Sequence, residues 1–303
     1  MTLKKALKII FCNSILDPKQ VDPDFVAEWS AAQEAGFECL LISFEDLQEG
    51  NLLKALKRIM SASNEVIALY RGWMLKPSEY QDLYEGLLDK HIRLLNSPQQ
   101  YKHWHYLPES YKHIQDHSPE SYWTSDLDME SIRETVKPFG SKSIILKDFV
   151  KSEKHHWLEA CFIPDASDFE KLQEVVSIFL ELRGHSLNEG LVFREFIDLE
   201  ALAKHSKSGM PLSREYRIFF LKNEAIQSYN YWEEGDYEDR LVNLDFAQEL
   251  AQSIESNFLS MDIAKSQAGQ WIIMELGDGQ VSELPEDADP AAFYKTLIKI
   301  LEY

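Results

Sequence analysis

The sequence has few cysteines and no long hydrophobic run. Its 3 cysteines, Cys12, Cys39 and Cys161, lie far apart in apolar contexts, and their spacing matches no metal-binding motif. This pattern predicts reduced thiols in the core of a cytoplasmic protein, not a disulfide framework. No stretch approaches the roughly 18 apolar residues that a membrane helix needs, so we expect no membrane partner.

Basic residues are also scarce, with 31 Lys and Arg against 51 Asp and Glu, a net charge of −20. This balance argues against a nucleic-acid partner or an anionic membrane surface, although a local basic groove is compatible with it. The motifs G-x-G-x-x-G and G-x-x-x-x-G-K-[ST] are absent, so neither standard phosphate loop is present. The 45% of hydrophobic residues exclude wholesale disorder, and 303 residues can form one large or two ordinary domains.

Residues 1–95 alternate between apolar strand patterns and amphipathic helix patterns. We expect strands over 6–13, 37–43, 66–70 and 91–95, and helices over 24–35, 52–60 and 80–88. This order predicts a small open α/β domain with right-handed crossovers. Ligands bind beyond the carboxyl ends of strands in such sheets, so Arg71 is either an anion-binding residue or a surface residue in a turn.

Residues 96–140 are rich in aromatic residues and histidine. Four histidines, His103, His105, His113 and His117, lie within fifteen positions, but no cysteine accompanies them and no H-E-x-x-H occurs. A metal site and a set of helix surfaces are both compatible with the spacing. We favour a helical linker, with a further helix over 129–136.

Residues 141–303 contain a second set of strands, expected over 143–150, 158–163, 191–197, 215–221 and 225–231, with helices over 168–182, 245–258 and 290–301. Lys147 is embedded in the first of these strands. A lysine in a buried strand is costly unless it is paired, and phosphate oxygens would pair it. The alternative is a lysine whose stem is buried and whose ammonium reaches solvent.

Glu215 and Arg217 share one face of the strand expected over 215–221, because side chains alternate along a strand. A guanidinium beside an acid is suited to stabilising a transferring phosphoryl group or an acyl phosphate. A cross-strand salt bridge is the alternative interpretation.

Two short apolar runs, 258–264 and 271–276, flank a polar turn and predict a β-hairpin. Asp262 lies in the first run and Glu275 at the end of the second. Directly opposed residues of antiparallel strands are about 5 Å apart, so both carboxylates can meet on one face. Such a pair suits Mg²⁺, which takes one or two carboxylates and leaves its other positions to water and phosphate. Two acids at strand ends in solvent are the alternative.

These segments, in this order, resemble the ATP-grasp superfamily: IILK at 144–147, VFREFI at 192–197, EYRIF at 215–219, then Asp262 and Glu275. The combination of Lys147 with Arg194 and Arg217 is similar to a clade named for two arginines and a lysine, frequent in phages and bacteria. The likeness covers most of residues 90–303. It implies a mixed α/β and α+β architecture: an N-terminal open α/β (pre-ATP-grasp-like) domain over 1–95, a linker over 96–140 and an ATP-grasp domain over 141–303.

The resemblance also implies a set of site residues. ATP would lie between the sub-domains, with Mg²⁺ on Asp262 and Glu275. The implied nucleotide-binding residues are Lys147, Lys151 on a flap that lacks the usual glycines, Glu195, Phe196, Ile197, Asp198 or Glu200 near the ribose, and Glu215. Arg194 and Glu195 point to opposite faces of a regular strand, so only one is expected to face ATP. Gly277 occupies the place of a usual third metal ligand, for which Asp278, Gln280 or water would substitute.

The function implied is an ATP- and Mg²⁺-dependent ligase that joins a carboxylate to an amine through an acyl phosphate, with Lys147, Arg194 and Arg217 as catalytic residues. A kinase or nucleotidyl transferase on the same site is one alternative. A non-catalytic binding module is another, favoured by Gly277 and the glycine-free flap. The carboxylate and amine substrates stay open, and so does the oligomeric state, for which a homodimer is one expectation.

Overall fold

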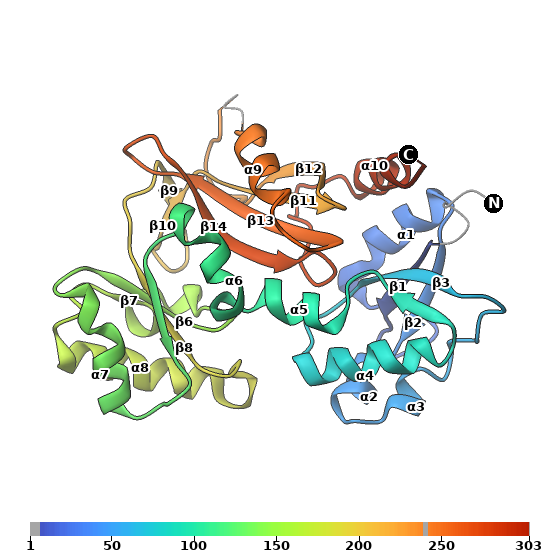
Figure 1. Cartoon of the computed structure of the whole chain (residues 1–303), viewed down its shortest axis with the longest axis horizontal. Coiled ribbons are helices and arrows are strands. Elements are labelled where there is room, and N and C mark those ends of the chain that lie inside the picture. The colour runs from blue at the N-terminus through green and yellow to red at the C-terminus, as the bar shows by residue number, and fades with distance from the viewer. Residues whose placement is uncertain (1–6, 239–241, 303) are drawn as a thin grey trace.

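The computed structural model describes residues 7–238 and 242–302, and Figure 1 shows their arrangement. The described strands form three four-stranded sheets and one two-stranded sheet. The first sheet lies with the N-terminal helices, the second with α7 and α8, and the third above both (Figure 1). None of the described helices is both long and apolar enough to cross a membrane.

The first sheet is parallel, with the order β2-β1-β3-β4, as the open α/β prediction requires. Its strands are β1 (Leu7–Cys12), β2 (Glu38–Ile42), β3 (Val66–Arg71) and β4 (Ile92–Leu94). Both faces are covered. In β1, Ile9 and Phe11 point into a core shared with α1 (Val26–Glu34) and α10 (Pro290–Glu302). Ile10 and Cys12 point into a second core, which includes residues from α2 (Phe44–Gln48), α3 (Leu52–Ala55) and α4 (Pro77–Leu88).

The helix expected over 52–60 is wrong in its second half, because α3 ends at Ala55. The amides of Lys57 and Ile59 donate to carbonyls three residues earlier, Lys54 and Leu56. Such bonds tighten the chain into turns that do not continue an α-helix. Leu56 and Ile59 are buried nonetheless, which explains why the apolar spacing resembled a longer helix.

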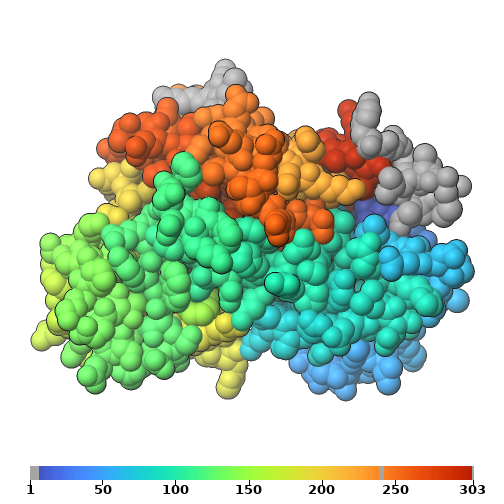
Figure 2. Space-filling model, viewed as in Figure 1, coloured from blue at the N-terminus to red at the C-terminus, as the bar shows by residue number. Residues whose placement is uncertain are grey.

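The segment 96–140 is only partly the helical linker expected. Helices α5 (Pro98–His105) and α6 (Leu107–Ile114) run across the middle of the molecule (Figure 1), and Figure 2 shows their segment at the surface there. Beyond them, β5 (Ser121–Thr124) pairs antiparallel with β8 (Leu191–Glu195) and α7 follows (Met129–Val136). The prediction missed β5 because a four-residue strand leaves too little alternation to read, although Tyr, Trp and Thr all favour strands.

The second sheet is antiparallel, with the order β5-β8-β6-β7, and is covered by α8 (Phe169–Arg183) and α7. The strand β6 (Ile144–Asp148) agrees with the predicted strand around Lys147. The strand expected over 158–163 is wrong for its first part: β7 is only Phe162–Ile163, and Trp157–Cys161 forms a π-helical turn. That turn buries Trp157, Ala160 and Cys161 and leaves Leu158 exposed, and its five residues are too few for the sequence pattern to distinguish it from a strand.

The third sheet is antiparallel, with the order β12-β11-β13-β14. Its strands are β11 (Glu215–Leu221), β12 (Glu224–Asn230), β13 (Phe258–Lys265) and β14 (Trp271–Asp278). Both predicted hairpins are present. Between β8 and β11 lies an unpredicted small hairpin, β9 (Ala201–Lys204) with β10 (Pro211–Ser213). The helix expected over 245–258 is shorter, since α9 spans Leu244–Ala251.

Candidate functional site

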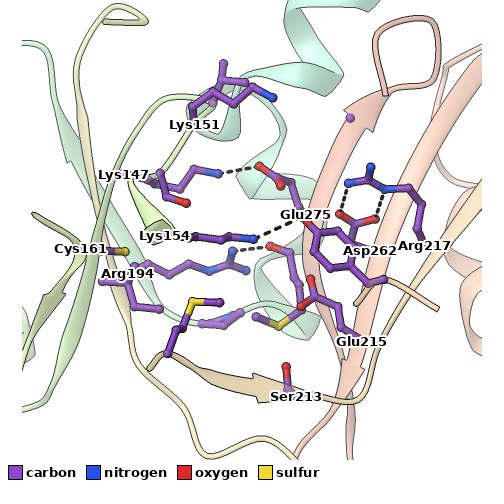
Figure 3. Close-up of a pocket in the computed structure, with 18 of the residues that line it drawn as sticks. Lys147, Lys151, Lys154, Cys161, Arg194, Ser213, Glu215, Arg217, Asp262 and Glu275 are labelled. Atoms are coloured by element: carbon purple, nitrogen blue, oxygen red, sulfur yellow. Dashed lines mark hydrogen bonds and ion pairs between the residues drawn. The ribbon is translucent and has the colours of Figure 1, made fainter. Parts of the chain in front are cut away.

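A cavity of about 360 Å³ opens between the second and third sheets. In Figure 3, Lys147, Lys154 and Arg194 project from one wall, and Glu215, Arg217, Asp262 and Glu275 project from the other. The charged lining residues are Lys147, Lys151, Lys154, Arg194, Arg217, Glu195, Glu215, Asp262, Glu275 and Glu283. The lining thus carries five cationic and five acidic side chains, in a chain whose net charge is −20.

Three site residues form one row across the third sheet. Arg217 on β11 pairs with Asp262 on β13, and Asp262 pairs with Glu275 on β14. Antiparallel register places directly opposed side chains on the same face, so all three project into the cavity. The predicted meeting of Asp262 and Glu275 on one face of a hairpin is confirmed. A register shift follows directly, between Asp262 and Ile263.

Asp262 is held by Arg217. Nε and Nη2 of Arg217 each donate to one carboxylate oxygen at 2.8 Å, and Nη1 donates to the Glu283 carbonyl. The guanidinium also lies over the Tyr231 ring, 4.9 Å from its centroid. Burial alone would lower the pKa of Arg217, but the charge of Asp262 outweighs it and raises that pKa. The cross-strand salt bridge therefore exists, and it lies inside the cavity.

Glu275 is held by Lys147, whose Nζ donates to Oε1 at 2.6 Å across the cavity. Lys147 shares its face of β6 with Ile145, while Ile144 and Leu146 point away into the core beneath α8. Burial would raise the pKa of Glu275, but the charges of Lys147 and Lys154 lower it to about 2. Glu275 is thus a carboxylate at any physiological pH.

Lys154 is a cavity residue that the sequence interpretation missed. Its Nζ lies 3.3 Å from the Tyr231 hydroxyl and about 5 Å from the ring centroids of Tyr231 and Trp232. Burial disfavours the ammonium, yet Tyr231, Glu215 and Glu275 outweigh it and raise the pKa of Lys154. Lys151, which was predicted, also lines the cavity but is exposed. The sequence feature that indicates Lys154 is its position in the loop that follows the strand of Lys147.

Glu215 lies in the same wall and is 6% exposed. Burial raises its pKa, and Asp262 and Glu275 add to this, while Lys154 and Arg217 oppose it; the result is about 7. Near neutral pH this carboxyl group therefore exists in both protonation states. Its charge is set by conditions and by what binds beside it.

Arg194 and Glu195 both line the cavity, in contrast to the expectation that only one would. Arg194 reaches across to the third sheet: its Nη atoms donate to the Met274 and Ile273 carbonyls and to Ser118 Oγ. Glu195, the last residue of β8, turns to Lys142 at 3.1 Å. The regular alternation fails because the strand ends there. Burial lowers the pKa of Arg194 to about 10, which still leaves it charged.

One end of the cavity is apolar. It is lined by Ile145, Trp157, Cys161, Phe196, Ile197, Leu199, Met210 and Trp232. Trp157, Phe162 and Phe196 pack ring to ring there. Of the predicted residues in this region, Phe196 and Ile197 line the cavity. Asp198 is exposed and outside the lining, and Glu200 pairs with Arg214 at 3.3 Å.

Two predicted ligands lie away from the cavity. Asp278 and Gln280 are fully buried and outside its lining, and Asp278 accepts hydrogen bonds from Asn96 and from Gln280. Burial raises the pKa of Asp278 to about 6, although its hydrogen bonds with Asn96 and Gln280 and the charge of Arg71 oppose this rise. The prediction of Asp278 or its substitute Gln280 as a metal ligand is therefore wrong: on β14, Asp278 follows Gly277 and so faces away from Glu275.

Arg71 is not an anion-binding residue of the site. It is 1% exposed and forms an ion pair with Glu28 at 2.8 Å, and it donates to the Gly279 and Ser282 carbonyls. The anion that it binds is a side chain of the protein itself.

Asp262 and Glu275 fit a hydrated divalent cation. Within the described residues, no group of three or more His, Cys, Asp or Glu side chains is placed to hold a metal, and this includes the four histidines of residues 96–140. Mg²⁺ needs only one or two carboxylates and takes its remaining oxygens from phosphate and water. The opposed carboxylates of Asp262 and Glu275 match that requirement. Each is now paired with a cationic side chain, Arg217 or Lys147, and a phosphate could bind that side chain in place of the carboxylate.

The comparisons with known proteins agree with this geometry. Residues 138–297, more than half of the chain, match the model of an ATP-grasp domain family, the third family of the clade named for two arginines and a lysine. The resemblance to that clade is therefore confirmed. A search of the curated proteins finds no match.

Solved structures of ATP-grasp proteins share the fold of the whole chain. A RimK domain ATP-grasp protein from Sphaerobacter thermophilus is 11% identical with a TM-score of 0.60, and the match covers 98% of this chain and 99% of that one. The ATP-grasp ligase PsnB, complexed with minimal precursor, Mg and ADP, is 11% identical with a TM-score of 0.56 and coverages of 98% and 99%. D-alanine–D-alanine ligase from Bacillus anthracis, complexed with ATP, is 13% identical with a TM-score of 0.56 and coverages of 98% and 96%.

Proposed function

The chain belongs to the ATP-grasp family, in the clade named for two arginines and a lysine, and on this basis we propose that it is an ATP- and Mg²⁺-dependent ligase that joins a carboxylate to an amine. The observation that carries the proposal is the row Arg217–Asp262–Glu275, which faces Lys147 and Lys154 across a cavity with one apolar end. One cavity thus contains cationic side chains that can bind phosphate, carboxylates that can bind a metal ion and an apolar wall that can pack against adenine.

Each wall has a separate role in binding ATP. Lys147 and Lys154 would bind phosphate oxygens, and Arg217 would stabilise the transferring phosphoryl group. Asp262 and Glu275 would hold Mg²⁺, which when bound offsets the charge of the phosphates. The aromatic residues Trp157 and Phe196 would pack against adenine at the apolar end.

The reaction divides into two substitutions. A carboxylate oxygen of one substrate attacks the γ-phosphorus, the bond to the β,γ-bridging oxygen breaks, and ADP leaves. The amine nitrogen of the second substrate then attacks the acyl carbon, phosphate leaves, and the amine proton passes to solvent. The protein contributes positioning and electrostatic stabilisation, chiefly from Lys147 and Arg217.

Thermal unfolding with and without a non-hydrolysable ATP analogue and Mg²⁺ tests the nucleotide site. A ligand that binds only the folded state raises stability by RT ln(1 + [L]/Kd), about 2.7 kcal/mol at a hundredfold excess over Kd. We expect a magnesium-dependent shift in the wild type that Glu275→Gln loses. Glu181→Gln, an exposed position on α8, is the matched control. No shift with millimolar nucleotide would reject the proposal.

Product analysis separates the proposed ligase from its alternatives. Ligation gives ADP and phosphate, a kinase gives ADP and a phosphorylated acceptor, and nucleotidyl transfer releases pyrophosphate from ATP. A non-catalytic module would bind nucleotide without magnesium-dependent turnover of any of these kinds.

A further inference from the structure

A polar recess adjoins the two carboxylates. On the hairpin of β13 and β14, the opposed pair Ser260–Gly277 lies two residues from the pair Asp262–Glu275, and therefore on the same face. A Cβ atom at Gly277 would lie 2.7 Å from Ser260 Oγ, 3.0 Å from Ser282 Oγ and 3.9 Å from His105 Nδ1. We call the group of His105, Ser260, Gly277 and Ser282 the Gly277 recess, and all four residues line the cavity. The centre of the recess needs a glycine, because a Cβ atom there would be too close to the two serine hydroxyl groups.

His105 is the unexplained group of this recess. It is 9% exposed, and neither of its ring nitrogens has a hydrogen-bond partner. An unsatisfied buried polar atom costs about 1–3 kcal/mol. The ring is held at the end of α5 between Tyr101 and Tyr106, with centroids 5.4 Å and 6.1 Å away. Burial, with the nearby charge of Lys151, lowers its pKa to about 3. His105 is therefore a neutral imidazole, with one lone pair and one N–H group unused.

The hydroxyl groups leave a second acceptor. Ser282 Oγ donates to the Asp278 carbonyl at 2.9 Å, so in its 2.6 Å contact with Ser260 the donor is Ser260 Oγ. Since each hydroxyl oxygen has two acceptor lone pairs, Ser260 Oγ can still receive a hydrogen bond. The recess thus presents acceptors, His105 and Ser260, immediately beside two carboxylates.

A divalent cation bound by the two carboxylates would bring its water molecules to these acceptors as hydrogen-bond donors. Mg²⁺ retains several waters when protein ligands are few, and the ligands proposed for it above are Asp262 and Glu275 alone. We propose that the Gly277 recess holds the water shell of the metal, with His105 and Ser260 accepting hydrogen bonds from metal-bound water. This inference rests on the proposed function and assigns His105 as a positioning residue, which acts on the metal through water.

Replacing the imidazole by a hydrocarbon ring tests the assignment. The measurement is the affinity of Mn²⁺ for the protein–ADP complex, obtained by electron paramagnetic resonance of the free ion; Mn²⁺ accepts the same oxygen ligands as Mg²⁺. Loss of groups that support metal ligands typically costs 10–100-fold in metal affinity. For His105→Phe we expect at least a tenfold loss, with metal-free ADP affinity unchanged within twofold. The melting temperature should stay equal or rise, because the unpaired nitrogens are gone.

Two further variants keep the test decisive. His113→Phe, exposed on α6, is the matched control and should bind Mn²⁺ like the wild type. Ser260→Ala removes one acceptor, together with the hydrogen bond that Ser260 donates to Ser282, and should weaken Mn²⁺ binding several-fold, which decides the question if His105→Phe does not fold. A wild type that binds no Mn²⁺ with ADP would reject the proposed function itself. If the wild type binds Mn²⁺ and both recess variants bind it with the same affinity, the role of the recess is rejected and the proposed function is not. The same conclusion holds if the two variants change only the KM of the amine.

Discussion

At the scale of single residues, Glu215 couples the cavity to pH. Its pKa is raised to about 7, with burial as the main cause. A folded state that holds a proton more tightly than the unfolded state loses stability as pH rises from the unfolded pKa of about 4.5 to the folded one. Removing the charge of this carboxyl group should therefore stabilise the unliganded protein at neutral and alkaline pH.

We predict that the free energy of unfolding of the wild type falls by ~1 kcal/mol or less between pH 6.5 and 7.5 and then becomes constant. Glu215→Gln should remove this decrease, because its amide does not titrate, and leave the small rise that His105 contributes, since its buried imidazole stays neutral where the unfolded one still binds a proton. Urea unfolding at several pH values measures both proteins. The window lies above the pKa of Asp278, about 6; Asp278→Asn is the control and should flatten the curve mainly below pH 6.5. An equal slope in Glu215→Gln would contradict the assignment.

At the scale of elements, the loop between β6 and β7 brings a second lysine to the cavity. Residues 154–156 form a 3-10 turn, which places Lys154 against Tyr231 and Trp232 and leaves Lys151 exposed. A lysine held by two aromatic rings has little conformational freedom left to lose when a phosphate binds. Lys154 should therefore contribute more to nucleotide binding than Lys151.

We predict that Lys154→Met weakens the binding of ADP at least tenfold, whereas Lys151→Met changes it less than threefold. The two substitutions remove the same charge from the same loop, so each serves as the control of the other. Isothermal titration calorimetry measures both affinities. Equal effects would show that the loop acts through its net charge and not through the position of Lys154.

The elements show where sequence reasoning succeeds. The meeting of Asp262 and Glu275 could be predicted because strand alternation and hairpin pairing fix the face and the neighbour of each residue, whereas Lys147 and Arg217 were grouped with them through the resemblance to the ATP-grasp superfamily. Lys154 and His105 could not be predicted as cavity residues. The first depends on a non-repeating turn, and the second on how α5 packs against β14. The prediction failed for Arg71 for the same reason, since its partner Glu28 is 43 residues away on another element.

At the scale of the whole molecule, Arg71 links three distant parts of the chain. From the end of β3 it forms an ion pair with Glu28 of α1, which also accepts a hydrogen bond from Tyr294 of α10 at 3.0 Å. Its Nη1 donates to the carbonyls of Gly279 and Ser282, in the segment that leaves β14. Ser282 and Glu283 of that segment line the cavity, so Arg71 joins the first sheet to the rim of the site.

We predict that Arg71→Met destabilises the protein by ~3–5 kcal/mol, because it leaves the carboxylate of Glu28 buried without a cation. The double variant Arg71→Met, Glu28→Leu should recover part of this loss, since neither charge is then buried alone. Tyr294→Phe should cost only about 1 kcal/mol, the value of one hydrogen bond. Urea unfolding measures these variants and, with the single variant Glu28→Leu added, gives the coupling energy between Arg71 and Glu28. A loss below about 1 kcal/mol in Arg71→Met would mean that apolar packing, and not this ion pair, holds the first sheet against the cavity rim.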